Sequence, residues 1–318
     1  MIETPMDVLH RFPVRKSKKQ KQAFREEIQS YAQSLGYRTA IEKGSLGCRN
    51  IVIGDPETAE YLVTAHYDTC AGMLFPNMVF PRNLVVLLLY QLFLVAVFIF
   101  IAYAAGSAVW IVTQQDGAAS LTAILVYLLQ FIGMMVGPAN RHNANDNTSG
   151  VVAVLETAKS MPESHRDKVC FVLFDLEELG LIGSSAHRKR HKAATNFQTV
   201  LNMDCVGDGD EIWLFPNKKL RRNDQELDRL CDLIGRWGKK TLHVHQRGFA
   251  IYPSDQASFP RGVAIAALRR SKWVGLYYGR IHTFRDKILD YTNINILRAA
   301  LITYITRHPG DHNHQEDT

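Results

Sequence analysis

Residues 168–180, "KVCFVLFDLEELG", join an uninterrupted apolar run to an acidic end. A short apolar run of this kind is typical of a strand buried on both faces of a sheet. Similar runs recur along the chain and alternate with helical patterns. We expect strands at 37–43, 49–55, 60–68, 198–207, 211–215 and 262–268, and helices at 18–35, directly after the polar turn 143–149, at about 181–192, at 224–238 and at 292–307.

This alternation predicts a three-layer α/β/α fold, in which a largely parallel or mixed sheet is flanked by helices. Ligands of such sheets bind at the carboxyl ends of the strands. The polar clusters of this sequence fall at those ends, so the sequence predicts a functional site there. The polar tail after residue 307 is expected to be solvated.

One segment interrupts the alternation. It comprises the uncharged run 83–112, which begins "NLVVLLLYQLFLVAVFIFIAY" (83–103), and a second apolar run, "LTAILVYLLQFIGMMVG" (121–137). As a helix the first run would be about 45 Å long, more than a hydrocarbon core of roughly 30 Å requires. We therefore expect a transmembrane helical hairpin at 83–137, with spans at about 84–111 and 120–137, inserted into one discontinuous domain made of 1–76 and 138–318. A buried hairpin in a soluble protein and an apolar arm that joins protomers are the alternatives. The membrane is favoured because helices apolar on all faces rarely interrupt a domain that has its own core.

The charges beside the hairpin predict its orientation. Arg82 and Arg141 flank the two runs, whereas the linker 113–120 contains no Lys or Arg. The positive-inside rule then places the catalytic domain in the cytoplasm and the linker outside the cell (inner or plasma) membrane. No signal peptide is expected, and the cysteines, which lack paired spacing, are expected to be reduced. The net charge of +6 comes without a basic stripe interleaved with aromatics, so nucleic acid is not an expected partner.

Nitrogen and carboxylate donors recur at the expected strand ends, in an order that would bring them to one rim. Such donors suit catalytic zinc, and a carboxylate shared by two ions, with one His and one further carboxylate on each side, would make a pair of sites. Because His66 and Asp146, which flank the hairpin, would belong to one centre, the chain between them must cross the bilayer an even number of times. The candidate ligands are His66, Asp146, Glu178, Asp204 and His282.

Local spacing suggests two further roles. His66 and Asp68 are two residues apart, so on a strand they share a face, and Asp68 can orient the imidazole through its other ring nitrogen. Glu177 and Glu178 are adjacent and cannot face a metal in the same way. One of them should coordinate, and the other should act as the general base beside a metal-activated bridging water.

The motifs "TAHYDT" (64–69), "NANDNTSGVVAVLE" (143–156), "FVLFDLEELGLIGS" (171–184), "LNMDCVG" (201–207), "SDQASF" (254–259) and "RIHTFRD" (280–286) resemble, in this order, those of metallopeptidase family 28. This family contains di-zinc aminopeptidases, bacterial leucyl aminopeptidases among them, and carboxypeptidases. The resemblance covers roughly 17–76 and 138–307. It implies two zinc ions bridged by Asp146, with His66 and Asp204 at one and Glu178 and His282 at the other. It also implies Glu177 as the base, Asp68 as the residue that orients His66, and a cis peptide after Asp146.

Two departures from the family pattern stand out. Gln256 occupies a position where the family often has His or Tyr, so Tyr252, Asp255 and Gln256 are only weak candidates for the substrate pocket. His66 and Asp146 are 80 positions apart, where the family has a short loop. The expected function is a membrane-anchored zinc aminopeptidase that acts on peptides or protein N-termini. A glutaminyl cyclase with one zinc and a catalytically inactive membrane scaffold are the alternatives.

Overall fold

The computed structural model describes residues 2–73 and 75–307, and the tail expected to be solvated lies outside them. Its centre is a mixed sheet with the strand order β1-β2-β4-β3-β5-β9-β6-β8-β7, and β10 pairs with β9 outside this path. Strands β4, β3, β5 and β9 run parallel to their neighbours, whereas β2 and β6 pair antiparallel at the two sides. The strand bounds are β1 Thr39–Lys43, β2 Arg49–Ile53, β3 Tyr61–His66, β4 Val169–Phe174, β5 Thr199–Met203, β6 Glu211–Pro216, β7 Gly235–Trp237, β8 Lys240–Val244, β9 Gly262–Ser271 and β10 Gly275–Tyr277.

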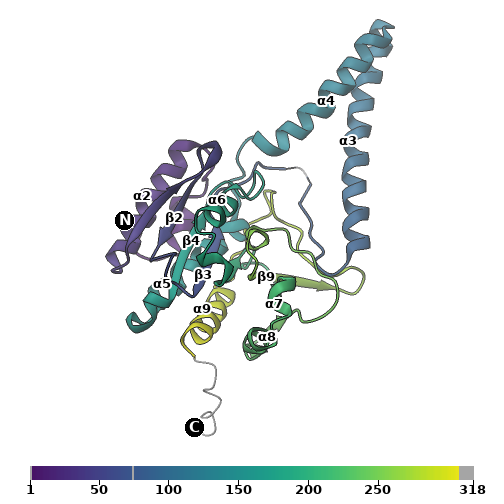
Figure 1. Ribbon diagram of the computed structural model, residues 1–318. Coiled ribbons are helices and arrows are strands. Elements are labelled where there is room, and N and C mark those ends of the chain that lie inside the picture. Colours follow the sequence, from purple (N-terminus) through teal and green to yellow (C-terminus); the bar gives the residue numbers. More distant parts are fainter. Residues whose placement is uncertain (1, 74, 308–318) are drawn as a thin grey trace.

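Helices cover both faces of the sheet, as the sequence predicts (Figure 1). On β4, Phe171 and Leu173 belong to the apolar cluster that contains α2, α5 and α9, while Val172 and Phe174 belong to a cluster on the other face. The ring of Phe174 packs there against His187 of α6. The helix bounds are α1 Asp7–Arg11, α2 Lys18–Ser34, α3 Leu84–Thr113, α4 Asp116–Val136, α5 Gly150–Ser160, α6 Ile182–Arg190, α7 Lys218–Arg221, α8 Asp224–Cys231 and α9 Tyr291–Thr306.

The predicted helix at 224–238 is wrong in its second half. Helix α8 ends at Cys231, and after a turn at 232–234 the chain forms the short strand β7. Trp237 pairs with Lys240 across a tight turn, in which Gly238 adopts a φ of +65°. That backbone conformation favours glycine and cannot continue a helix. The strand β10 was not predicted at all, because three residues show no periodicity.

The apolar runs form two long helices that project from separate places on the domain and meet at their far ends (Figure 1). α3 ends two residues later than the predicted span 84–111, and α4 begins four residues earlier than the predicted span 120–137. Only Gln114 and Gln115 separate the two helices. Both helices are long and apolar enough to cross a membrane, and none of their most apolar window is buried in the described protein. The exposure of these windows is contrary to the alternative of a hairpin buried in the core.

The two ends of the insertion meet beside the sheet. Ala71 forms an isolated antiparallel bridge with Ala139, and the Gly72 amide donates to the Pro138 carbonyl at 2.9 Å. Residues 75–83 lead to the first turn of α3, whereas α4 returns directly to Pro138. The first and second candidate ligands therefore remain close in space although they are far apart in sequence.

Candidate metal centre

All five predicted ligands lie together at the carboxyl edge of the parallel strands. His66 ends β3, Glu178 and Asp204 follow β4 and β5, and Asp146 lies in the helical turn that precedes α5. His282 arrives from the segment after β10. The polar ends of separate strands converge because parallel strands present their carboxyl ends at one edge.

Asp146 occupies the centre of the cluster. Its Oδ1 lies 3.3 Å from His66 Nε2, and its Oδ2 lies 3.0 Å from His282 Nε2. On the first side Asp204 Oδ1 is 3.9 Å from His66 Nε2, and on the second Glu178 Oε2 is 3.3 Å from His282 Nε2. The cluster therefore consists of two halves that share one carboxylate, and each half has one imidazole and one further carboxylate.

Asp68 holds the loop that carries the two glutamates. Its Oδ1 accepts the Glu177 amide at 3.1 Å and its Oδ2 accepts the Glu178 amide at 3.3 Å. His66 Nδ1 lies 3.3 Å from the Asp68 carbonyl oxygen and 3.6 Å from its Oδ1. Asp68 thus lies beside His66 and fixes both acidic residues through their main chain, while the orienting role of its carboxylate toward His66 stays a prediction.

The turn around Asp146 is held by groups that the sequence did not indicate. Asp286 accepts the amides of Asn145 and Asp146 at 2.7 and 3.0 Å. The peptide between Asp146 and Asn147 is cis, as the family resemblance implies. Asn147 Nδ2 donates to the Met203 carbonyl at 3.0 Å, which ties this turn to the end of β5.

Arg15 lies completely buried behind the cluster. It donates to the carbonyls of Phe12 and Tyr67 and to the Thr148 hydroxyl, which joins the N-terminal segment to the ends of β3 and the Asp146 turn. Burial lowers the pKa of Arg15 to about 10, so it stays charged at neutral pH. Its positive charge offsets part of the crowding of carboxylates.

The pKa shifts in the metal-free cluster describe a site crowded with negative charge. Burial raises the pKa of Glu177 well above its ordinary value and that of Glu178 to about 7. Burial disfavours the charged form of His282, but the neighbouring carboxylates of Glu178 and Asp146 outweigh it and raise the pKa to about 9. The site therefore holds protons that a divalent cation would displace.

The donor set fits zinc. Groups of donor atoms lying within 4.8 Å of one another include His66, Asp146 and Asp204, and separately Cys70, Glu178 and His282. Glu178 Oε1 is buried without a hydrogen-bond partner, as expected for an atom that faces a cation. Imidazole and carboxylate donors, with a thiol at one side, are ligands that zinc accepts. The sequence did not indicate Cys70 as a candidate ligand, because a single cysteine without a second donor at metal-ligand spacing is not a recognisable metal motif.

The three weak pocket candidates are buried rather than open. The Tyr252 hydroxyl donates to the Asp204 carbonyl at 2.9 Å, and Gln256 Nε2 donates to the Tyr252 carbonyl. Asp255 is completely buried, and burial raises its pKa to about 7. The polar atoms of Tyr252 and Gln256 bond within the protein, whereas both Asp255 carboxylate oxygens are buried without a hydrogen-bond partner. The role of the three residues toward a substrate stays a prediction.

A second buried cluster joins β1 to α6. The two oxygens of Glu42 lie 2.8 Å from His187 Nδ1 and 2.7 Å from His191 Nε2, and Glu57 Oε1 lies 2.5 Å from His191 Nδ1. Each carboxylate oxygen faces one ring nitrogen at hydrogen-bond distance, so we interpret this cluster as a hydrogen-bonded brace.

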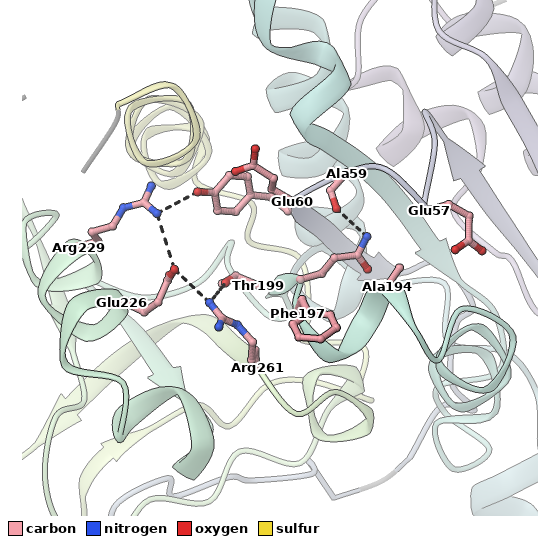
Figure 2. Close-up of a pocket in the computed structure, with 11 residues that line it drawn as sticks. Glu57, Ala59, Glu60, Ala194, Phe197, Thr199, Glu226, Arg229 and Arg261 are labelled. Atoms are coloured by element: carbon pink, nitrogen blue, oxygen red, sulfur yellow. Dashed lines mark hydrogen bonds and ion pairs between the residues drawn. The ribbon is translucent and has the colours of Figure 1, made fainter. Parts of the chain in front are cut away.

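A pocket of about 370 Å³ lies at the opposite edge of the sheet, where β3 and β5 begin. Figure 2 shows Arg229 and Arg261 directed at Glu226, whose Oε1 is 3.8 and 3.0 Å from them. Glu226, Arg229 and Arg261 of this pocket are paired with one another, and the pocket shares no residue with the metal centre.

The mixed sheet with helices on both faces and a donor cluster at its carboxyl edge is the architecture of zinc exopeptidases. The model of peptidase family M28 matches residues 131–304, more than half of the chain, and the chain belongs to this family. No curated protein matches its sequence.

Solved structures match over nearly the whole chain at low identity. The aminopeptidase LapA of Legionella pneumophila is 16% identical, with a TM-score of 0.57, over 95% of this chain and 70% of its own. The glutaminyl cyclase of Porphyromonas gingivalis is 17% identical, with a TM-score of 0.54, over 95% of this chain and 96% of its own. That of Bacteroides thetaiotaomicron is 14% identical, with a TM-score of 0.55, over 96% and 95%. At these identities the likeness establishes the fold.

Proposed function

We propose that this protein is a membrane-anchored, two-zinc aminopeptidase that removes N-terminal residues from peptides. The observation that carries the proposal is the position of Asp146, whose two oxygens face His66 and His282 separately. A carboxylate placed between two donor sets is what a pair of metal ions requires. In the proposed centre His66 and Asp204 hold one ion, and Glu178 and His282 hold the other.

Glu177 is the proposed general base. Its Oε2 lies 4.0 Å from His66 Nε2 and its side chain remains partly open, at 14% exposure. Bound zinc would polarise the scissile carbonyl and lower the pKa of the attacking water. Glu177 would take the proton of that water and return it to the leaving amine, as a general base that then acts as an acid. Asp68 keeps Glu177 in place through the main chain.

The decisive experiment compares Glu177→Gln with the wild type on aminoacyl-arylamide substrates, with zinc measured in the same samples. We expect two zinc ions per chain in both proteins and a loss of activity on the order of 10²–10⁴-fold in the variant. Chelation should abolish wild-type turnover, and zinc should restore it. Full activity in Glu177→Gln with metal bound would refute the mechanism.

The same samples separate the alternatives. One zinc per chain, with cyclisation of N-terminal glutamine and no aminopeptidase turnover, would favour the glutaminyl cyclase. If the zinc-loaded protein catalysed neither aminopeptidase turnover nor glutamine cyclisation, the catalytically inactive membrane scaffold would be favoured.

The hairpin supports the proposed anchoring in the cell membrane. Lys16 Nζ donates to the Met135 carbonyl at 3.1 Å, so it neutralises the carboxyl end of α4. Together with Arg82 and Arg141 it places basic residues at the domain end of the hairpin, and the far turn has Asp116 alone. This distribution favours a cytoplasmic catalytic domain.

Cysteine accessibility tests the orientation. A cysteine introduced at Gln114 should react with an impermeant maleimide on intact cells, whereas one at exposed Arg222 should react only after the cells are opened. The reverse pattern would contradict the proposed topology.

The substrates we propose are short peptides or protein N-termini presented at the inner membrane surface. The segment that leads to α3 borders the metal centre, since the Met73 amide donates to the His282 carbonyl at 2.7 Å. The return from α4 borders it through Ala139 and its bridge to Ala71. Both ends of the hairpin therefore adjoin the rim of the site.

A further inference from the structure

The turn between β9 and β10 presents an unusually exposed indole. Trp273 is 92% exposed, the highest value among the large apolar side chains of the described residues. A tryptophan left in water forgoes the burial of about 150–250 Å² of largely apolar surface. Beside it stands Lys272, whose ammonium makes no hydrogen bond or ion pair to the part of the chain that the structure describes.

The turn lies beside the N-terminal end of α3, which we call the foot of this helix. β9 pairs with β5 as far as Ile265 and then extends to Ser271, beyond the edge of the sheet that carries the metal centre. Figure 1 shows the end of β9 directed at the lower end of α3. Asn83 Nδ2 donates to the Val274 carbonyl at 3.3 Å, and Asn83 Oδ1 accepts the Val86 amide at 3.1 Å. One side chain thus caps α3 and holds the turn beside it.

Apolar exposure continues around this foot. Val85, in the first turn of α3, is 67% exposed, and Phe249 is 48% exposed. Ile251 is also exposed, and its amide donates to the Pro81 carbonyl at 2.8 Å, which brings its segment to the entry of the helix. The surface around the turn is therefore continuous with the apolar surface of α3.

We propose that the turn Ser271–Val274 lies in the headgroup region of the bilayer that receives the hairpin. Trp273 would sit at the boundary between headgroups and acyl chains, where indoles are enriched because one end is apolar and the other donates a hydrogen bond. Lys272 would extend toward the lipid phosphates. A bilayer is favoured over a protein partner because the turn adjoins α3, whose apolar surface is exposed from its first turn.

The contact would set how the active site faces the membrane. After the turn the chain returns through β10 to Tyr278, which bridges to Val79 in the segment leading to α3, and reaches His282 four residues later. With the foot of α4 held by Lys16, the domain would be fixed to the bilayer on two sides of the metal centre. This step rests on the proposed function, and it limits preferred substrates to N-termini held close to the lipid surface.

The test uses the full chain in nanodiscs of phosphatidylcholine and phosphatidylglycerol, with lipids brominated either near the headgroups or deep in the acyl chains. Bromine quenches tryptophan at short range, so difference spectra between the wild type and Trp→Phe variants report the depth of single residues. The component removed by Trp273→Phe should be quenched more strongly by the shallow bromines than by the deep ones. Trp237→Phe, on the edge strand β7 where the indole packs against the core, is the matched control and should remove an unquenched component.

Trp110→Phe separates this proposal from the anchoring itself, because Trp110 belongs to α3. If the Trp110 component is quenched and the Trp273 component is not, the turn proposal is overturned and the hairpin stands. If neither component is quenched, the anchoring fails and the turn proposal fails with it. As a functional arm, Trp273→Ser with Lys272→Ser should slow the hydrolysis of a lipid-tethered peptide and leave that of a soluble aminoacyl-arylamide unchanged. Equal rates on the tethered peptide would contradict the orienting role.

Discussion

Asp68→Asn tests whether the Asp68 carboxylate positions the glutamate loop. The substitution keeps the size of the side chain and replaces one oxygen by an NH₂ group. Each Asp68 oxygen accepts a main-chain amide, from Glu177 at 3.1 Å or Glu178 at 3.3 Å. Whichever way the asparagine turns, one amide N–H then faces a donor and loses its acceptor.

The size of the effect follows from those two bonds. Asp68 is 4% exposed, so water cannot replace the lost acceptor. A hydrogen bond to a charged group contributes about 1.5–3 kcal/mol, and a buried unsatisfied N–H costs about 1–3 kcal/mol. We expect the loop geometry to lose about 2–4 kcal/mol, which is roughly a 30- to 1,000-fold fall in kcat/KM if the whole loss is felt in the transition state. Zinc affinity should fall about 10–100-fold, as for other residues that orient metal ligands.

The assay is kcat/KM on an aminoacyl-arylamide at saturating zinc, with zinc affinity from competition against a chelator. Asp55→Asn is the matched control, since Asp55 Oδ1 accepts the Glu57 amide at 2.9 Å in an exposed turn. If Asp68 only oriented His66, the substitution would change kcat/KM and zinc affinity little, because asparagine keeps one carbonyl oxygen for that imidazole. Wild-type rate and zinc affinity in Asp68→Asn would therefore refute the positioning of the loop.

Three further predictions concern stability. Burial lowers the pKa of His187; burial alone would raise the pKa of Glu42, but hydrogen bonds from its two histidine partners outweigh it and lower the pKa. Both groups thus stabilise the fold above their ordinary pKa values of 6.5 and 4.5 and lose that contribution as the pH falls. The melting temperature should therefore drop on acidification, first through His187 and then, below pH 4.5, through Glu42, and Glu42→Gln should lack the second step. Arg15→Met should lower the free energy of unfolding by about 3–5 kcal/mol in denaturant titrations, because it leaves buried carbonyls and carboxylates without their cation; a change near zero would contradict this. Gly183→Ala should lower the melting temperature, because its Cβ would overlap a buried main-chain oxygen, whereas Gly117→Ala meets open space and should not.

Strand ends were predictable because each strand carries its own signal. The apolar run that ends in Glu177 and Glu178 and the run that ends in His66 reveal both the element and its polar terminus. When such strands pair in parallel, their carboxyl ends lie at one edge of the sheet regardless of the length of the connecting loops. This is why residues far apart in sequence could be assigned to one centre without knowledge of their contacts.

The supporting residues could not be predicted in the same way. Arg15 stands in a basic segment that predicts a solvated surface, yet it is completely buried and charged. Its burial depends on the path of the N-terminal segment behind β3, which no local pattern encodes. Asp286 and Cys70 likewise gain their roles from neighbours more than 60 residues away in sequence. The misassigned end of α8 is a different failure, since Gly235 and Gly238 were present as signals and were outweighed by the helical pattern before them.

The position of the hairpin explains how a long insertion can interrupt the candidate metal centre without disrupting it. The Ala71–Ala139 bridge and the Gly72–Pro138 hydrogen bond close the domain across the base of the insertion, so His66 and Asp146 are held by the sheet and its adjoining turn. Met73 and residues 75–82 are then not needed to connect the ligands, yet the Met73 amide donates to the His282 carbonyl, and Val79 exchanges main-chain hydrogen bonds with Tyr278. A simple tether would require neither contact. The main chain of His282 is thus hydrogen-bonded to the segment that leads to α3, which is the physical basis for expecting a bilayer around the hairpin to influence which substrates reach the site.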